Sequence, residues 1–262
     1  MLRRRLQAAR SGAEDMRILA LISTRGGAGR SFLTASLADV WRRRGQPVLL
    51  VDLDAHNGLA LELGAAQRPA AGLVASSVDG KVWADSAQTN SDGINFLPCG
   101  DIDAGASHKF EAGLAANPQW LRQQLDRLAL PPETLVLVDT PRLPSVAAEH
   151  AARVADAVLG VLTPDASSYA QLDRLEALRP QRTRYIINQF EPARPLQRDL
   201  RVLLRDELGA RLAPFTLHRD ASVADAQARN VALLDDAPHS QAAEDLQLLA
   251  SWLLAGMTPS AA

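Results

Sequence analysis

The sequence predicts an α/β protein with a doubly wound, mostly parallel sheet and helices on both faces. Short apolar runs alternate with helical patterns along most of the 262 residues. Several of these runs are apolar on both faces, as in strands buried between two helix layers. A glycine-rich loop follows the first run, at the edge where such sheets bind ligands.

Each expected strand is a short apolar run bounded by polar or turn residues. The strands cover residues 18–23, 47–54, 94–100, 134–141, 157–164 and 184–190, with a last short strand at 212–220. Helical patterns occupy residues 33–45, 120–128, 146–154 and 244–254, and Gly45 closes the first of these helices. Residues 67–93 are rich in Ala, Ser and Gly with weak periodicity, which predicts an insertion or a mobile loop.

One domain is expected over residues 16–256, between a polar N-terminal tail at 1–15 and a C-terminal tail at 257–262. The N-terminal tail is expected to be disordered. MRILALIS forms a natural first strand, so a start of translation at Met16 is one alternative. A short basic amphipathic contact with a membrane is another interpretation of this tail.

The composition indicates a protein of a reducing cytoplasm without a membrane span. Cys99 is the only cysteine, which excludes an internal disulfide and the paired ligands of a nitrogenase-type iron–sulfur cluster. No apolar run reaches about 18 residues, and the net charge of −2 gives no overall attraction to nucleic acid. The histidines fit no compact metal-ligand spacing. Lysine occurs only at Lys81 and Lys109, so arginine carries nearly all the positive charge.

The loop STRGGAGRSF at residues 23–32 indicates a phosphate-binding site. Gly26, Gly27 and Gly29 allow backbone amides to curl around an anion, and the helix that starts at Ser31 adds its free amides and dipole. The Ser31 hydroxyl is placed for Mg²⁺ beside the phosphates. The alternative is a glycine turn that only joins strand to helix.

Polar residues end several of the expected strands and converge on the same edge as this loop. Asp139 follows a buried apolar run and is expected to orient a metal-bound water, the alternative being a helix cap. Asp52 and Asp54 share a face if the strand runs through both, one toward an attacking water and one toward the metal. His56 and Asn57 are either switch residues or a solvated turn. Asn188 ends a strand with an amide that matches the donor and acceptor edge of adenine.

The motif RGGAGRS at residues 25–31 resembles the deviant Walker A loop, K-G-G-x-G-K-[ST], of the MinD/ParA-type (SIMIBI) P-loop ATPases. VDLD at 51–54 resembles that family's switch I, and LVLVDTP at 135–141 its Walker B strand. Within the family, FLPCG, NPQWLRQQL, LVDTPR, YIINQF and LHRDASVADAQARNVAL most resemble the BcsQ branch of bacterial cellulose biosynthesis. The similarity covers nearly the whole chain from Met16 to Leu254.

The resemblance implies a P-loop ATPase-like domain that binds ATP and Mg²⁺ and closes as a nucleotide-sandwich homodimer. It implies that Arg25 reaches the partner's phosphates, that Asp54 positions the attacking water and that Asp52 supports the metal region. The expected nucleotide-binding residues are Gly26, Gly27, Ala28, Gly29, Arg30, Ser31, Phe32, Asn188, His218, Arg219 and Asp220, and the expected metal-site residues are Ser31, Asp52 and Asp139. The loop at 217–222 would close over the base, although a structural role for His218 is the simpler interpretation.

Arginine stands at both lysine positions of that motif, Arg25 and Arg30. Guanidinium is broad and planar, whereas lysine places a compact charge deep among phosphate oxygens. Binding of ATP is therefore expected to persist while hydrolysis is slow or lost. General depletion of lysine explains the substitutions without removing their geometric consequence.

The expected function is assembly, localisation or activation of the cellulose synthase complex. The implied partners are a second copy of this chain, subunits of that complex and a small BcsR-like protein, with recruitment to the inner membrane through them. A ParA-type DNA-binding ATPase is one alternative, but acidic residues interrupt its basic stripe and favour a salt-bridged helix; the stripe is Arg194, Arg198, Arg201, Arg205 and Arg211. A MinD-like membrane clamp is the other, but the apolar spacing of the last helix favours core packing.

Overall fold

The computed structural model describes residues 16–128, 130–179 and 181–257. The expected N-terminal tail and residues 258–262 lie outside the described residues. Met257, the first residue of the expected C-terminal tail, is the last residue of helix α13 (Gln241–Met257). Among the described residues, no helix combines the length and the apolar composition needed to cross a bilayer.

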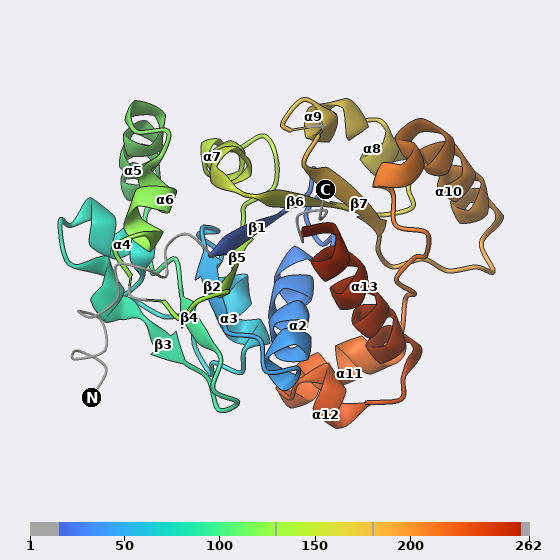
Figure 1. Ribbon diagram of the computed structural model, residues 1–262, viewed down its shortest axis with the longest axis horizontal. Helices are drawn as coiled ribbons and strands as arrows, with labels where there is room; N and C mark the ends of the chain where they lie inside the picture. The colour runs from blue at the N-terminus through green and yellow to red at the C-terminus, as the bar shows by residue number, and fades with distance from the viewer. Residues whose placement is uncertain (1–15, 129, 180, 258–262) are drawn as a thin grey trace.

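A seven-stranded sheet forms the centre of the molecule, in the order β3-β4-β2-β5-β1-β6-β7 (Figure 1). All neighbouring strands are parallel except β3, which pairs antiparallel with β4 at the edge. The strands are β1 (Arg17–Ile22), β2 (Val48–Asp52), β3 (Gln88–Thr89), β4 (Asn95–Leu97), β5 (Leu135–Asp139), β6 (Ala157–Leu162) and β7 (Thr183–Ile187). The predicted doubly wound, mostly parallel α/β fold is confirmed.

Helices cover both faces of the sheet and enclose one apolar core on each side (Figure 1). In β1, Ile18, Ala20 and Ile22 enter one core while Leu19 and Leu21 enter the other, as the period of two requires. One layer contains α2 (Arg30–Arg43), α3 (Gly58–Glu62), α11 (Ala221–Arg229), α12 (Leu233–Asp236) and α13; the other contains α5 (Ala104–Ala116), α6 (Trp120–Leu125), α7 (Val146–Val154), α8 (Ala166–Tyr169), α9 (Leu172–Glu176) and α10 (Pro195–Leu208).

The segment at 212–220, expected as a last strand, is not a strand. It meets β7 and the residues after it at the isolated bridges Tyr185↔Leu212 and Phe190↔His218 and through the Leu217 N–H, which donates to the Ile187 carbonyl at 2.9 Å. Pro214 lies between these bridges and has no N–H to donate, so a continuous ladder cannot form. A short 3₁₀ turn, η2 (Gly209–Arg211), leads into this segment.

Residues 67–93 contain regular structure, so the mobile-loop expectation is wrong where these elements lie. The segment forms α4 (Leu73–Val78), the 3₁₀ turn η1 (Trp83–Ser86) and β3. Leu73 and Val74 are fully buried in the core. Weak periodicity hid these contacts because the inward-facing residues are divided between two short elements: Val78 of α4 and Trp83 of η1 also pack partly against the core.

The buried side chain of His150 on α7 predicts a loss of stability in acid. Its Nε2 accepts a hydrogen bond from the Leu121 N–H at 3.3 Å, and burial, with a smaller effect of Arg153, lowers its pKa from 6.5 to about 4. The unfolded chain therefore takes up this proton first as the pH falls. The contribution of His150 to the free energy of unfolding is therefore unchanged above pH 6.5. As the pH falls from 6.5 to 4, the free energy of unfolding decreases by up to about 3 kcal/mol.

Urea unfolding at a series of pH values checks this prediction. His150→Gln keeps an acceptor for the Leu121 N–H but cannot titrate, so its stability should fall less over that window. Equal pH profiles for the two proteins would contradict the assignment.

Candidate functional site

The carboxyl ends of the central strands meet at one edge of the sheet, and the glycine loop lies there. The register pairs Asp52 at the end of β2 with Asp139 at the end of β5, and pairs Asp139 with Leu21 of β1. Residues 23–29 follow β1 directly and lead into α2. The fold therefore places the glycine loop beside two buried carboxylates.

The backbone of the glycine loop adopts a conformation that requires glycine at two positions. Gly27 and Gly29 have φ of +72° and +88°, values that residues other than glycine rarely adopt. A Cβ on Gly29 would also lie 2.4 Å from Nδ2 of Asn188. Gly29 is the N-cap of α2, and no side chain caps this helix. Its first amides are available to an anion.

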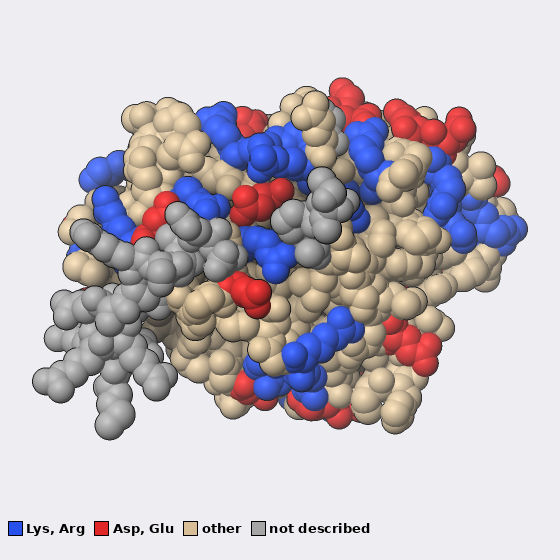
Figure 2. All heavy atoms as spheres, in the orientation of Figure 1, with Lys and Arg blue, Asp and Glu red and all other residues tan. Residues whose placement is uncertain are grey.

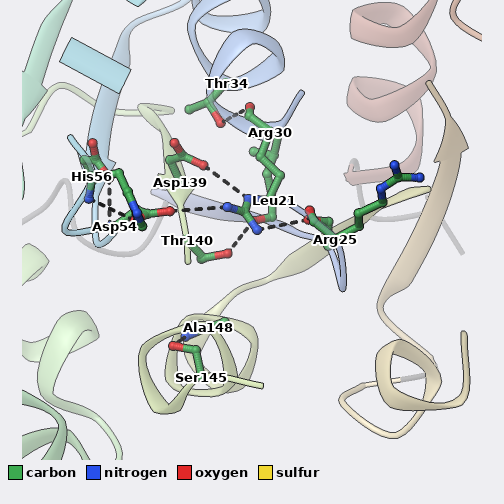
Figure 3. A network of polar contacts seen from close by, with 12 residues as sticks. Leu21, Arg25, Arg30, Thr34, Asp54, His56, Asp139, Thr140, Ser145 and Ala148 are labelled. Carbon is green, nitrogen blue, oxygen red and sulfur yellow. Dashed lines mark hydrogen bonds and ion pairs between the residues drawn. The ribbon is translucent and has the colours of Figure 1, made fainter. Parts of the chain in front are cut away.

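Arg30 points into the carboxylate cluster (Figure 3). Its guanidinium donates to the Ser23 hydroxyl at 2.9 Å and to Oδ2 of Asp54 at 3.3 Å, and its Nε lies 3.9 Å from Oδ1 of Asp139. The side chain is only 10% exposed. Arg30 thus supplies the positive charge among three carboxylates that lie at or just beyond the ends of two strands, β2 and β5.

Asp52 and Asp139 are both fully buried. Oδ1 of Asp52 accepts the Asp54 N–H at 2.8 Å, but the other Asp52 oxygen and both Asp139 oxygens make no hydrogen bond among the described residues. Burial raises the pKa of Asp52 well above its usual range, and Asp139 adds repulsion. Burial also raises the pKa of Asp139 to about 6, opposed by the nearby Arg30 guanidinium and Ser31 hydroxyl.

Asp54 lies beyond β2, so the premise that a strand runs through both Asp52 and Asp54 is not met. A turn after the strand brings Asp54 to Arg30 instead, and its Oδ1 contacts Nδ1 of His56 at 2.7 Å. The next two residues, expected as switch residues or as a solvated turn, differ in their surroundings. The His56 side chain is 84% exposed, whereas Asn57 is buried and exchanges hydrogen bonds with the backbone of Gly100.

Arg25 turns away from the cluster (Figure 3) and forms an ion pair with Asp165 after β6. Its side chain is 49% exposed. Asp165 also caps α8 by accepting the Ser168 N–H at 3.0 Å. The Arg25 guanidinium is therefore held at the protein surface by a residue of the same chain.

Two residues at the end of β7 hold the glycine loop from the other side. Asn188 donates from Nδ2 to the Ala28 carbonyl at 2.8 Å, and Gln189 donates from Nε2 to the Gly27 carbonyl at 2.8 Å. The Asn188 Oδ1 accepts the Gln189 N–H at 2.9 Å. Asn188 keeps its second amide hydrogen for another acceptor.

A cavity of about 470 Å³ opens between this loop and α13. Its walls combine glycine-loop backbone, amide groups and apolar side chains, and they include Gly27, Ala28, Gly29, Arg30, Ser31, Phe32, Asn188, Gln189, Leu217, His218, Arg219, Asp220, Val223 and Leu246. Most residues expected to bind the nucleotide therefore share one cavity. A second cavity, of about 520 Å³, adjoins it and shares Phe32, Glu62, Val223 and Gln227.

Some expected site residues have partners that give them a structural role. Asp220 caps α11 through the Ser222 N–H at 2.9 Å and also accepts the Ala242 N–H at 3.1 Å. Arg219 is largely exposed and lies 3.5 Å from Glu191. Both line the cavity, but neither contacts the carboxylate cluster.

Sequence reasoning missed Ser23, Asp165, Gln189 and Asp245. Asp165 and Gln189 follow β6 and β7 on the same edge, so the rule that selected Asp139 would also have selected them. Asp245 is buried on α13 and accepts hydrogen bonds from His218, a contact between distant segments that no local pattern reveals.

Two features could have indicated the alternative functions: the arginine stripe for DNA binding and the apolar side chains of α13 for membrane binding. Residues of both have contacts within the chain. Arg194 pairs with Glu191, Arg211 with Glu176, and Arg205 donates to the Ala213 carbonyl. Basic and acidic side chains are mixed over the face in Figure 2. On α13 the apolar side chains face the core: Leu246, Leu249 and Leu253 are buried, and Trp252 packs partly against the core. The core-packed last helix is confirmed. The ion pairs of the arginine stripe lie at its two ends, and among the described residues no ion pair joins Arg198, Arg201 or Arg205 of α10 to an acidic side chain.

The residues present fit ATP and Mg²⁺. Three buried carboxylate oxygens without hydrogen bonds suit a cation and its water shell, and the uncapped start of α2 suits phosphate. Among the described residues, no group of three or more His, Cys, Asp or Glu is arranged to hold a metal. Mg²⁺ is commonly held by one or two carboxylates together with water and phosphate.

Comparison with known proteins identifies relatives of this chain. A Salmonella typhi protein named "Cellulose biosynthesis protein BcsQ" is 29% identical over 248 residues, covering 91% of this chain and 94% of its own. The septum site-determining protein MinD of Pyrococcus horikoshii, solved with Mg-ADP, has a TM-score of 0.70 at 20% identity, covering 93% of this chain and 99% of its own.

Cobyrinic acid a,c-diamide synthase of Mycobacterium smegmatis, solved with an ATP analogue and magnesium, has a TM-score of 0.71 at 17% identity, covering 93% and 96% of the two chains. These solved structures share the fold. The family described as "Cellulose biosynthesis protein BcsQ" matches residues 16–254. The chain belongs to the BcsQ family of MinD/ParA-type proteins.

Proposed function

We propose that this protein binds ATP–Mg²⁺, closes as a nucleotide-sandwich homodimer and regulates the assembly, localisation or activity of a bacterial cellulose synthase complex. The observation that carries this proposal is the uncapped glycine loop beside buried carboxylate oxygens without hydrogen bonds. Membership of the BcsQ family over residues 16–254 supports the link to cellulose synthesis. Subunits of that complex and a small BcsR-like protein are the proposed partners, with recruitment to the inner membrane through them.

The residues divide into phosphate-binding, metal-site and base-binding groups. The glycine-loop amides and Arg30 bind phosphate, while Ser31, Asp52 and Asp139 hold the metal and its waters. Asp54 orients the attacking water, and Asn188 binds the base. When bound, Mg²⁺ neutralises phosphate charge. Arg25 leaves Asp165 and reaches the nucleotide of the second subunit.

Hydrolysis is slow in this proposal because Arg30 is shared with the carboxylates. The Arg30 guanidinium is paired with Asp54 and lies near Asp139. It therefore meets the phosphates as a broad, planar group that is already partly paired, whereas lysine would present a compact charge. Its ties to Asp54 also restrain the residue that orients water. ATP then serves chiefly to hold the dimer.

Restoring the lysines should therefore accelerate turnover. Arg25→Lys with Arg30→Lys is expected to raise the rate of phosphate release at saturating ATP by roughly tenfold or more, and Asp54→Ala in the same background should abolish the gain. Arg42→Lys with Arg44→Lys on α2 is the matched control and should leave the rate unchanged. A rate equal to that of the unaltered protein would contradict the explanation for slow hydrolysis.

Sizing by light scattering with and without ATP–Mg²⁺ tests the proposed dimer. The unaltered protein should change from monomer to dimer, and Arg25→Ala should bind ATP but remain monomeric because it cannot reach across the interface. Retained nucleotide is identified after each run. A monomer under every condition would overturn the proposed function.

A further inference from the structure

A cavity of about 800 Å³ lies between α7 and α9, which belong to the same helix layer (Figure 1). The residues that line it are Leu143, Pro144, Glu149, Arg153, Arg174, Ala177, Leu178 and Arg179, and none of them lines the cavity beside the glycine loop. Leu143 is buried, whereas Arg153, Arg174 and Ala177 are exposed. This α7–α9 groove therefore opens to solvent above an apolar floor.

The positive charge around the groove is not neutralised within the described residues. No ion pair there joins Arg153, Arg174 or Arg179 to an acidic side chain. Glu149 lies one helical turn before Arg153, at a spacing that favours an ion pair, but the two side chains do not pair. Asp173 accepts the backbone N–H of Arg174 at 2.9 Å and leaves its guanidinium unpaired. Three guanidinium groups are thus available to an anionic partner.

Contacts within the chain hold the groove in shape. Arg179 donates from Nη1 to the Arg153 carbonyl, which ties the segment after α9 to the end of α7. The Leu143 N–H donates to the Ser23 carbonyl at 2.9 Å, which holds the floor against the start of the glycine loop. Leu178 packs partly against the core. The backbone of the groove is therefore already ordered for a partner, which lowers the cost of binding.

The lining residues discriminate among anionic partners. They include no aromatic side chain, so the bases of a nucleic acid have no ring on which to stack. The exposed carboxylate of Glu149 would also repel a continuous phosphate backbone. A lipid surface is flat, and the buried Leu143 lies below the exposed arginines, out of its reach. A peptide that carries both acidic and apolar side chains matches the rim and the floor together.

We infer that the α7–α9 groove binds an acidic, amphipathic peptide segment of a partner protein. Its apolar side chains pack on Leu143, Pro144 and Leu178, and its carboxylates pair with Arg153 and Arg174. Arginine and carboxylate groups form bidentate pairs, which fix orientation as well as adding affinity. The inference goes beyond the proposed function, which assigns no surface to a partner, and it does not require bound nucleotide.

Selection from a random peptide display library against the nucleotide-free protein tests the inference. The enriched peptides are expected to combine Asp and Glu with Leu, Ile or Phe, and their affinity is then measured by fluorescence anisotropy. Arg153→Gln with Arg174→Gln should weaken binding by roughly tenfold or more, because the carboxylates lose their partners. Ala177→Glu should weaken it by roughly tenfold as well, because it places a negative charge in the groove. Arg179 is left unaltered because it holds the Arg153 carbonyl.

Arg44→Gln with Arg68→Gln is the matched control. It removes the same two charges at exposed positions outside the groove and should leave the affinity unchanged. Urea unfolding shows whether each variant folds, and the two groove variants alter different residues, so either one suffices. ATP titration of the same variants should give unchanged affinity, which keeps this test separate from that of the proposed function.

Three results would overturn the inference. The first is a selection that enriches no acidic peptide. The second is an acidic peptide that binds both groove variants as tightly as it binds the unaltered protein. The third is binding of duplex DNA or of vesicles of anionic lipid that both groove variants lose, without binding of acidic peptides, because the groove would then serve another class of partner.

Discussion

Replacing Arg30 with alanine is expected to weaken ATP–Mg²⁺ binding by at least about 100-fold and to destabilise the nucleotide-free protein by about 3 kcal/mol. Both effects have one cause, because this side chain is 10% exposed and is the positive charge among Asp54, Asp139 and their neighbours. Its removal leaves the buried carboxylates without a counter-charge, and it removes from the glycine loop the side chain that we propose binds phosphate. Calorimetric titration with ATP and urea unfolding measure the two effects separately.

Arg44→Ala provides the control for this prediction. Arg44 is the C-cap of α2, at the opposite end of that helix from Arg30; it is exposed, and among the described residues its side chain hydrogen-bonds to Gln247 and Ser251 of α13. Its loss should change stability by less than about 1 kcal/mol and leave the affinity unchanged. If Arg30→Ala behaves in the same way, Arg30 has neither of the roles assigned to it.

Asp139→Asn is expected to stabilise the nucleotide-free protein while it weakens Mg²⁺-dependent nucleotide binding. The fully buried carboxylate makes no hydrogen bond among the described residues, and burial opposes its ionisation. A neutral amide of the same shape removes that cost and should raise the free energy of unfolding by about 1–3 kcal/mol. The same change removes the charge that orients metal-bound water, so Mg²⁺-linked affinity should fall roughly 10- to 100-fold.

Opposite signs for the two measurements distinguish a functional carboxylate from a structural one. Thermal unfolding without nucleotide gives the first, and ATP titration with and without Mg²⁺ gives the second. Asp173→Asn makes the same chemical change at an exposed position of α9 and should alter neither. A destabilised Asp139→Asn protein would show that the carboxylate holds the fold together.

The parallel sheet, and the edge of the sheet on which the candidate site lies, could be predicted from the sequence. Buried parallel strands read as continuous apolar runs, so β1, β2, β5, β6 and β7 were predictable, and polar residues at their ends marked the site. The segment at 212–220 misled because apolar residues around Pro214 imitate a strand, although proline cannot donate to a ladder.

Side-chain partners across the site could not be predicted in this way. The Arg25–Asp165 pair, the two carboxylate contacts of Arg30 and the His218–Asp245 dyad each join segments that are 24 to 140 residues apart. Such contacts depend on rotamers within a packed site, which neither periodicity nor spacing encodes. The glycine loop predicted that a phosphate binds; the three-dimensional contacts assign the arginines their different surroundings.

Asn57 connects the turn after β2 to the loop after the neighbouring strand β4. Its amide donates to the Gly100 carbonyl at 2.8 Å and accepts the Gly100 N–H at 3.0 Å, and Gly100 lies against Gly72 at the start of α4 so closely that neither has room for a Cβ. A displacement of the turn that carries Asp54 must break both hydrogen bonds or move Gly100 with it. Through Gly72, the segment at 67–93 is therefore packed against the same loop that Asn57 ties to the turn carrying Asp54.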